Sequence, residues 1–331
     1  QDVFTGLRDE RVIVMGCNPR ITHVIPGIMK AAEELDAVVT FELSRSEGDL
    51  DGGYTGQNPE SFCDTLLEYA DTCRFTKPFV IHADHISVPD SSDAQIESAR
   101  LLMEAQIKAG FTSFSIDASS MGIMENIKVT KLLASLLEGN GCGLEVGLGG
   151  VKHVGTDSKL TELSETHEYL SGLVTEGLHP HLLSIDNGSK SGNYLDGQMV
   201  RIDLERTGEI FVAAREYGLA GLVQHGITGT PLRIVGRLSD YGIRKGNIGT
   251  LWQNVAHAGL PLELMDAMRD WARENSRDIK YATRLFKSEI DSIPEENILM
   301  IQDMAYREAK EFLKAFHAQG SATKLAEKLR H

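Results

Sequence analysis

The sequence predicts a (β/α)8 barrel, the TIM-barrel fold, followed by a helical extension at the C-terminal end. Eight short apolar or β-branched runs recur along the chain, and most of the stretches between them have helical periodicity. At roughly 30 residues for each strand and helix, eight such units fill about 240 residues, which fits a closed barrel better than an open sheet.

The expected strands are the eight apolar runs. In chain order they are VIVMGC from Val12, AVVTFEL from Ala37, PFVIHA from Pro78, SFSIDAS from Ser113, LEVGL from Leu144, LLSID from Leu182, GLVQHG from Gly221 and GNIGT from Gly246. Between the third and fourth runs, residues 96–109 place their apolar side chains largely along one face, and Gly110 is suited to end this helix.

Two further segments lie outside this repeat. The Gly-rich stretch RSEGDLDGGYTGQNPESF, from Arg45 to Phe62, is long enough to be functional, and we expect it to act as a lid. Residues 279–331 have helical spacing, so we assign residues 1–278 to the barrel domain and 279–331 to a helical extension that packs on the barrel or on a neighbouring subunit.

Composition limits the possible functions. The chain has 331 residues, of which 41% are hydrophobic and 24% charged, as expected for a folded globular protein. Its formal net charge of -15 argues against a nucleic-acid partner. The four cysteines form no C-x-x-C pair, and no apolar stretch approaches the length of a membrane helix. We therefore expect a cytoplasmic protein with no membrane partner.

Every expected strand ends in a polar residue. Active sites of this fold form at the C-terminal ends of the strands. A single polar residue there is more often a helix cap or turn former than a catalyst, but eight together point to a functional rim. The residues are Asn18, Glu42, Asp84 with His85, Asp117, Glu145, Asp186 with Asn187, His225, and Asn247 with Thr250.

Three of these residues could bind a divalent metal. His85, His225 and Glu145 follow different strands, and a mixed histidine and carboxylate set is typical of Zn²⁺, although each histidine taken alone is more often structural. Asp84, next to one of these ligands, would be placed to move protons at a metal-bound substrate. The alternative role for Asp84 is to orient neighbouring backbone.

The loops after the last two strands indicate a phosphate site. HGITGT at residues 225–230 and GNIGT at 246–250 are Gly-rich, and this is where barrel enzymes commonly bind phosphate, although Gly-Thr pairs also mark ordinary turns. A sugar phosphate is the expected ligand. The candidate binding residues are Asn18, Gly192, Thr228, Gly229, Asn247, Gly249 and Thr250.

Over residues 10–255, roughly, the chain resembles the class II (zinc-dependent) ketose-bisphosphate aldolases. The resemblance is carried by GCN, HADH, SIDAS, LEVGLGGV, HGITG and GNIGT, in this order. It implies that Asp84 is a general acid/base, that His85 and His225 bind zinc or another divalent metal, and that Asn247 and Thr250 hold the substrate's backbone and phosphate.

Two departures from the family pattern affect the site. The stretch GSKSGNY has Ser191 where the family has a third zinc-binding histidine, and GGVKH has Lys152 and His153 where the family has Glu and Asp. Glu145 or His153 could complete a three-ligand metal site, and His153 could serve as a catalytic base.

The resemblance implies a lyase of carbohydrate metabolism, such as glycolysis. It would cleave or form a C–C bond in a ketose phosphate, through a dihydroxyacetone-phosphate-like intermediate, and would be a homo-oligomer, either a dimer or a tetramer. Two alternatives stay open: a metal-dependent sugar-phosphate epimerase and a noncatalytic aldolase-like subunit. A second resemblance supports these alternatives: GGYTGQNP, the Asp-His pair and IDAS also resemble the tagatose-bisphosphate aldolase accessory subunits and their epimerase-like relatives.

Overall fold

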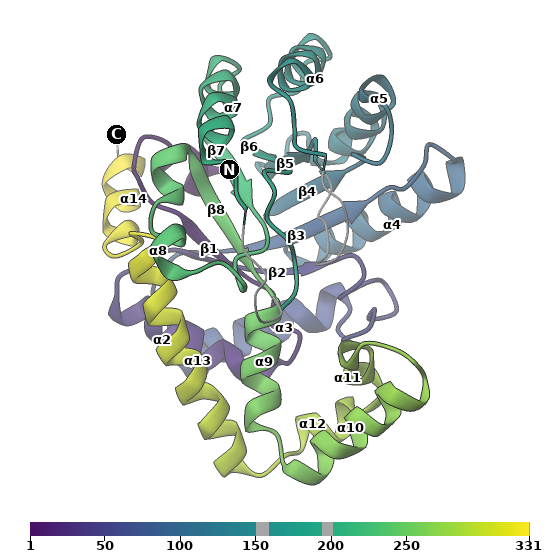
Figure 1. Cartoon of the computed structure of the whole chain (residues 1–331), viewed down its shortest axis with the longest axis vertical. Coiled ribbons are helices and arrows are strands. Elements are labelled where there is room, and N and C mark those ends of the chain that lie inside the picture. Colours follow the sequence, from purple (N-terminus) through teal and green to yellow (C-terminus); the bar gives the residue numbers. More distant parts are fainter. Residues whose placement is uncertain (150–158, 194–200, 331) are drawn as a thin grey trace.

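The computed structural model describes residues 1–149, 159–193 and 201–330 of the chain. Eight parallel strands close into a barrel in which each strand pairs with the next and β1 pairs with β8 (Figure 1). The predicted fold class is confirmed. The strands are β1 (Val14–Cys17), β2 (Val39–Ser44), β3 (Phe79–Ser87), β4 (Ser113–Asp117), β5 (Gly143–Gly147), β6 (Leu182–Ser184), β7 (Gly221–Gln224) and β8 (Ile243–Ile248).

Helices connect successive strands around the outside of the barrel (Figure 1). Their ends carry ordinary local signals: Asn58 caps α3 by accepting a hydrogen bond from the Ser61 backbone at 2.9 Å, and Gly110 ends α4 with a left-handed φ of 107°. None of the described helices is long and apolar enough to cross a membrane. The elements up to residue 259 are α1 (Asp2–Gly6), η1 (Thr22–Val24), α2 (Ile25–Glu34), α3 (Pro59–Thr72), α4 (Asp93–Ala109), α5 (Ile123–Ala134), η2 (Ser135–Leu137), α6 (Leu163–Thr175), α7 (Leu204–Glu216), α8 (Leu232–Val235), η3 (Leu238–Tyr241) and α9 (Thr250–Gly259).

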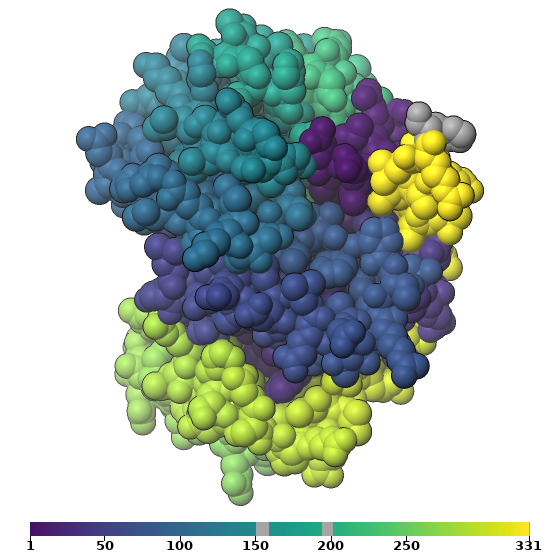
Figure 2. Space-filling view, turned by 180° about the vertical axis from the view of Figure 1, so that it is seen from behind, coloured from purple at the N-terminus to yellow at the C-terminus, as the bar shows by residue number. Residues whose placement is uncertain are grey.

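The C-terminal elements lie against this ring of helices. α13 packs along α2 and α9, and a Cβ atom at Gly27 of α2 would lie 2.2 Å from the Gln302 carbonyl oxygen, so a larger residue would push the two helices apart. α14 lies beside α1, and Figure 2 shows the two chain ends on one face of the molecule. These elements are α10 (Leu262–Glu274), η4 (Ile279–Tyr281), α11 (Ala282–Leu285), α12 (Lys287–Asp291), α13 (Glu295–Ala315) and α14 (Ser321–Leu329).

Strand β8 begins three residues before the run that we expected to form it. Our expected strand began at Gly246, whereas β8 begins at Ile243 and includes Arg244 and Lys245. Lys245 is fully buried, because two carboxylates inside the barrel pair with it. Charged residues seldom occupy a strand buried on both faces, which is why the sequence pattern hid this part of the strand.

Strand β3 has a bulge near its C-terminal end. Its register with β4 shifts between Ala83 and Ile86, and His85 has a left-handed φ of 42°. Successive residues of a regular strand point to opposite faces, but a bulge re-aims one of them. As a result, the consecutive residues Asp84 and His85 line the same pocket.

The Gly-rich loop after β2 is packed, although we expected it to act as a lid. Glu47, Thr55 and Gln57 have buried side chains, and the Arg284 backbone N–H of α11 donates a hydrogen bond to the Tyr54 carbonyl at 3.0 Å. In this structure the loop forms a wall of the pocket described below.

Candidate active site

A cavity of about 750 Å³ opens at the C-terminal ends of the strands. Most of the polar strand-end residues that the sequence singled out converge on it. Those that line the cavity are Asn18 after β1, Asp84 and His85 in β3, Asp117 in β4, His225 after β7, Asn247 in β8, and Thr250 at the start of α9.

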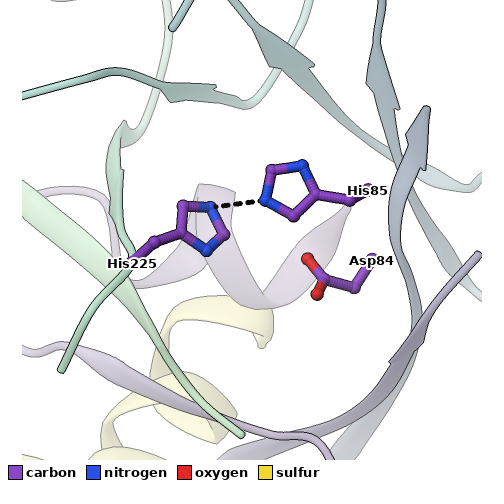
Figure 3. Close-up of side chains that lie close together, drawn as sticks. All are labelled: Asp84, His85 and His225. Carbon is purple, nitrogen blue, oxygen red and sulfur yellow. Dashed lines mark hydrogen bonds between the residues drawn. The ribbon is translucent and has the colours of Figure 1, made fainter. Parts of the chain in front are cut away.

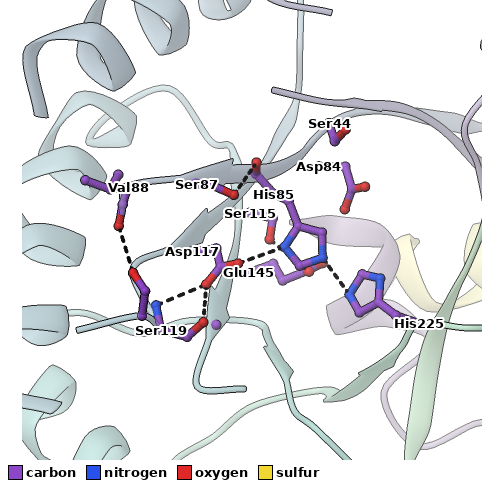
Figure 4. A network of polar contacts seen from close by, with 12 residues as sticks. Ser44, Asp84, His85, Ser87, Val88, Ser115, Asp117, Ser119, Glu145 and His225 are labelled. Carbon is purple, nitrogen blue, oxygen red and sulfur yellow. Dashed lines mark hydrogen bonds and ion pairs between the residues drawn. The ribbon is translucent and has the colours of Figure 1, made fainter. Parts of the chain in front are cut away.

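Two histidines from opposite parts of the barrel face each other in this cavity (Figure 3). The Nε2 atoms of His85 and His225 are 3.1 Å apart. The other ring nitrogen of His85, Nδ1, lies 3.1 Å from Asp117 Oδ2, and Asp117 also accepts hydrogen bonds from the backbone and hydroxyl of Ser119 (Figure 4). Asp117 therefore fixes the orientation of the His85 ring.

The two rings differ in proton affinity. Burial alone would lower the pKa of His85, but the Asp84 and Asp117 carboxylates outweigh it and raise the pKa to about 9. Burial and the neighbouring His85 lower the pKa of His225 to about 3. Without a metal ion, the pair therefore carries one positive charge, on His85, and a metal ion held by both Nε2 lone pairs would displace the extra proton.

The donor set fits a divalent metal ion. One nitrogen each of His85 and His225 and one oxygen of Asp84 all lie within 4.8 Å of one another. A carboxylate on the second ring nitrogen, as Asp117 provides for His85, is the usual companion of a metal-binding histidine. We call Asp84, His85, Asp117 and His225 the open cluster, because all four line the cavity.

Asp84 is held by two amides. The side-chain nitrogen of Asn247 donates a hydrogen bond to Oδ1 at 2.9 Å, and that of Asn18 donates to Oδ2 at 3.2 Å. Burial alone would raise the pKa of Asp84, but His85 and Lys245 outweigh it and lower the pKa. We expected both asparagines to bind substrate; both line the cavity, and their amide N–H groups donate to Asp84.

Glu145 makes contacts different from those expected of a third metal ligand. Its Oε2 accepts a hydrogen bond from Lys245 Nζ at 2.9 Å, and its Oε1 accepts one from Ser115 Oγ at 2.9 Å. Burial alone would raise the pKa of Glu145, but Lys245 outweighs it and lowers the pKa well below its usual range. The carboxylate is thus already neutralised by an internal cation, which reduces its attraction for a metal ion.

Glu145 belongs to a second group, which we call the sealed cluster: Glu42, His82, Glu145 and Lys245. Each is at most 1% exposed, and none lines the cavity. Lys245 Nζ also lies 3.1 Å from Glu42 Oε2, and His82 Nε2 lies 3.4 Å from Glu145 Oε2 without a hydrogen bond. Within this cluster, the positive charge of Lys245 neutralises carboxylate charge inside the barrel.

Two other positions bear on the third ligand. Ser191, which stands where a third histidine was expected, lines the cavity with a hydroxyl in place of an imidazole. His153 and Lys152 lie outside the described residues. Among the described residues that line the cavity, His85 and His225 are therefore the candidate metal ligands, and Asp84 lies close beside them.

The expected phosphate corner lies at the start of α9. Gly192, Thr228, Gly249 and Thr250 line the cavity, whereas Gly229 does not. The Leu251 backbone N–H donates a hydrogen bond to Thr228 Oγ1 at 3.1 Å, which ties the loop after β7 to the first turn of α9. A helix N-terminus with free backbone N–H groups is suited to bind an anion.

Arg20, Glu47 and Lys280 are among the charged residues of the cavity wall that were missed in the sequence. Arg20 and Glu47 pair at 2.6 Å, and Lys280 places its Nζ 5.7 Å from the Tyr54 ring centre and 5.3 Å from that of Tyr281. Among the described residues, no carboxylate pairs with Lys280 Nζ, whereas the Lys280 backbone N–H donates a hydrogen bond to Asp278 Oδ1 at 2.9 Å. All three lie in loops or in a short helical turn, where charged residues are common and carry no periodic signal.

The chain matches the family model described as class-II fructose-bisphosphate aldolase over residues 1–316. It is 24% identical over 238 residues to a fructose-bisphosphate aldolase of Giardia intestinalis, covering 71% of this chain and 66% of the relative. It is 28% identical over 229 residues to a 6-phospho-5-dehydro-2-deoxy-D-gluconate aldolase of Halalkalibacterium halodurans, covering 66% and 65%. The matches thus span just under two thirds of both relatives. The solved YdjI aldolase of Escherichia coli K12 superimposes with a TM-score of 0.65 and 19% identity, covering 96% of this chain and 95% of that chain.

Proposed function

The chain belongs to the class-II fructose-bisphosphate aldolase family, and from this premise we propose that it is a metal-dependent lyase that cleaves or forms a C–C bond in a ketose phosphate. The observation that carries the proposal is the open cluster itself. Two facing histidines and a separately held carboxylate share one cavity. The proposed reaction needs both, because it uses a bound cation and a proton carrier.

We assign the metal to His85 and His225, with Asp117 holding the His85 ring. A divalent ion at this position supplies a Lewis acid that polarises the substrate carbonyl. Zn²⁺ is our first choice, because imidazole nitrogen is among its usual ligands.

Asp84 is the proposed proton carrier for the C4 hydroxyl of the substrate. Asn18 and Asn247 each occupy one of its oxygens, which fixes the plane of the carboxylate and leaves further lone pairs for the substrate. Its lowered pKa keeps it ionised at neutral pH, ready to accept that proton when the C3–C4 bond breaks. His153 is the proposed second base.

The substrate's phosphate is proposed to bind at Thr228, Gly249 and Thr250, where the first turn of α9 faces the cavity. Lys280, a cavity-wall residue whose Nζ has no carboxylate partner among the described residues, supplies a positive charge for a second anionic group. The protein's net charge of -15 makes such local groups necessary.

The second candidate is a noncatalytic aldolase-like subunit, and the observation that favours it is Ser191, which replaces an expected metal-binding histidine. An epimerase would use the same carbonyl activation with a different fate for the intermediate. The relatives named above differ in substrate, so both fructose bisphosphate and 6-phospho-5-dehydro-2-deoxygluconate belong in the first test.

The test combines metal analysis with turnover. Protein purified without chelator is expected to contain about one divalent ion per chain and to release a triose phosphate from a ketose phosphate, with both properties lost after chelation and restored by Zn²⁺. Epimerised substrate without cleavage would indicate the epimerase. Protein that neither retains nor takes up metal, and turns over neither compound, would support the noncatalytic subunit.

We further propose that the protein is cytoplasmic and forms a homo-oligomer. Leu262 and Leu285, which are 71% and 58% exposed on the C-terminal helices, are candidates for burial at such an interface. Light scattering of the purified chain measures its oligomeric state directly, and a monomer at micromolar concentration would contradict the proposal.

A further inference from the structure

Glu47, in the loop after β2, has a carboxylate that is surrounded by hydrogen-bond donors. The side chain is 3% exposed. Its Oε1 accepts hydrogen bonds from Arg20 Nε at 2.6 Å and from the Tyr54 hydroxyl at 3.1 Å. Its Oε2 accepts hydrogen bonds from Asn18 Nδ2 at 2.9 Å and from the Ser44 backbone N–H at 2.8 Å. Four donors fix both oxygens of this residue.

Asn18 connects this carboxylate to Asp84. The same Nδ2 atom that donates to Glu47 also donates to Asp84 Oδ2, at 3.2 Å. A side-chain amide has two N–H hydrogens, and its oxygen can only accept. Between two carboxylates, Asn18 must therefore direct its nitrogen to both, because a flipped amide would place its oxygen against two anions.

We propose that Glu47 is a positioning residue that holds the Asp84 carboxylate in place by fixing the amide of Asn18. This inference rests on the proposed function, since it concerns the carboxylate assigned there to proton transfer. Asn247 holds the other oxygen of Asp84 from β8, so Glu47 and Asn247 act on opposite sides of one group. A proton carrier with one such restraint removed samples orientations in which its lone pair misses the substrate.

The backbone around Glu47 is fixed as tightly as its side chain. Thr55 Oγ1 donates a hydrogen bond to the Glu47 carbonyl at 2.7 Å. At Gly53, whose φ is 52°, a Cβ atom would lie 2.6 Å from the same carbonyl oxygen, so a larger residue there would displace it. Arg284 of α11 holds the loop from outside through the Tyr54 and Gly53 carbonyls. The restraint on Asp84 therefore begins in the C-terminal helices.

A purely structural role is the competing explanation, because Glu47 also neutralises the buried Arg20. A double-mutant cycle separates the two roles. The variants are Glu47→Gln, Asn18→Ala and the double variant, with Asn58→Ala as a control that weakens the same loop at the cap of α3 without touching Asn18.

We expect Glu47→Gln and Asn18→Ala each to lower kcat about 10- to 100-fold, with KM within about twofold and metal content unchanged. In the Asn18→Ala background, Glu47→Gln should cause no further loss of kcat. Asn58→Ala should lower the melting temperature and leave kcat unchanged. Glu47→Asp, which keeps the charge beside Arg20 but shortens its reach to Asn18, provides the same comparison if Glu47→Gln does not fold.

Crystal structures of the wild type and of the Glu47 variant test the same idea without turnover, since the Asn18 amide should turn away from Asp84 in the variant alone. If the wild type cleaves no ketose phosphate but the amide turns, the proposed function fails and the positioning role stands. Additive losses in the double variant, or a Glu47 variant with lowered melting temperature but wild-type kcat and an unmoved Asn18, would overturn the positioning role.

Discussion

The barrel holds two groups of ionisable residues of similar chemistry, and they differ in where the compensating charge lies. The sealed cluster contains its own cation, Lys245, which pairs with both of its carboxylates. The open cluster contains two histidines and two carboxylates on the cavity wall, and its two Nε2 atoms face each other at 3.1 Å. One cluster is electrically complete, and the other has donors available for an added cation.

This difference indicates how ionisable residues with a structural role can be distinguished from those with a functional role in such a barrel. Burial alone does not distinguish them, because Asp84 and Glu145 are 5% and 1% exposed. What distinguishes them is the partner: Glu145 faces a lysine, whereas Asp84 faces amides that orient it without neutralising it. Substitutions in the two clusters should therefore affect different properties.

Asp84→Ala should have the largest effect in the open cluster. Loss of a general acid/base typically lowers the rate about 10²- to 10⁴-fold, and the variant should keep its metal and its fold because it loses a proton carrier and no assigned ligand. Steady-state kinetics with metal analysis of the same sample check both parts. Wild-type turnover in this variant would remove Asp84 from the mechanism.

Lys245→Met should have the largest effect in the sealed cluster. It leaves the buried, ionised carboxylate of Glu145 without its cation, and breaking a buried ion pair costs about 3 to 5 kcal/mol of unfolding free energy. Urea unfolding measures this loss. Adding Glu145→Gln to the variant should restore part of the stability, whereas an unchanged unfolding midpoint in Lys245→Met would mean that the sealed cluster contributes no net ion pairing.

Asp117→Asn and Glu145→Gln form a matched pair that compares the clusters directly. Removal of the carboxylate behind a metal-binding histidine lowers metal affinity about 10- to 100-fold, so we expect this loss in Asp117→Asn. In Glu145→Gln we expect unchanged metal affinity and lowered stability. Titration with Zn²⁺ in a competing chelator measures both affinities, and a weaker site in Glu145→Gln would return Glu145 to the list of ligands.

The smallest effect concerns the pH dependence of stability. Burial raises the pKa of Glu42 to about 8, with Lys245 opposing the rise. Between the ordinary pKa of a glutamate, about 4.3, and this value, the native state holds a proton that the unfolded chain has released, so stability falls as pH rises through this window. Glu42→Gln should flatten that fall in urea unfolding at pH 5, 6.5 and 8. Parallel slopes in the variant and the wild type would contradict the protonation of Glu42.

Much of the fold was predictable because the same unit, an apolar strand followed in most cases by an amphipathic helix, occurs eight times along the sequence. Asp84, His85 and His225 could be found because each follows such a run, and strands of a barrel bring their ends together. Lys245 could not be placed, because a charged residue within a strand contradicts the pattern until its partners are known. We grouped Glu145 with His85 and His225 and could not foresee its contact with Lys245, because Lys245 itself had not been placed in a strand.

Glu47 and Lys280 could not be predicted at all. Both lie in irregular segments distant in sequence from the residues they accompany, and tertiary contacts alone give them a role. The bulge at Asp84 and His85 is also invisible in the sequence, because nothing in VIHADH departs from an ordinary strand.

The left-handed backbone at His85 has a consequence for how this chain can change over generations. Residues other than glycine hold such a conformation at a cost of about 1 to 3 kcal/mol, so glycine at this position would favour the folded barrel. Selection for stability alone would therefore favour replacement of His85. A related chain that no longer needs the proposed metal ligand would therefore be expected to lose the imidazole at this position early.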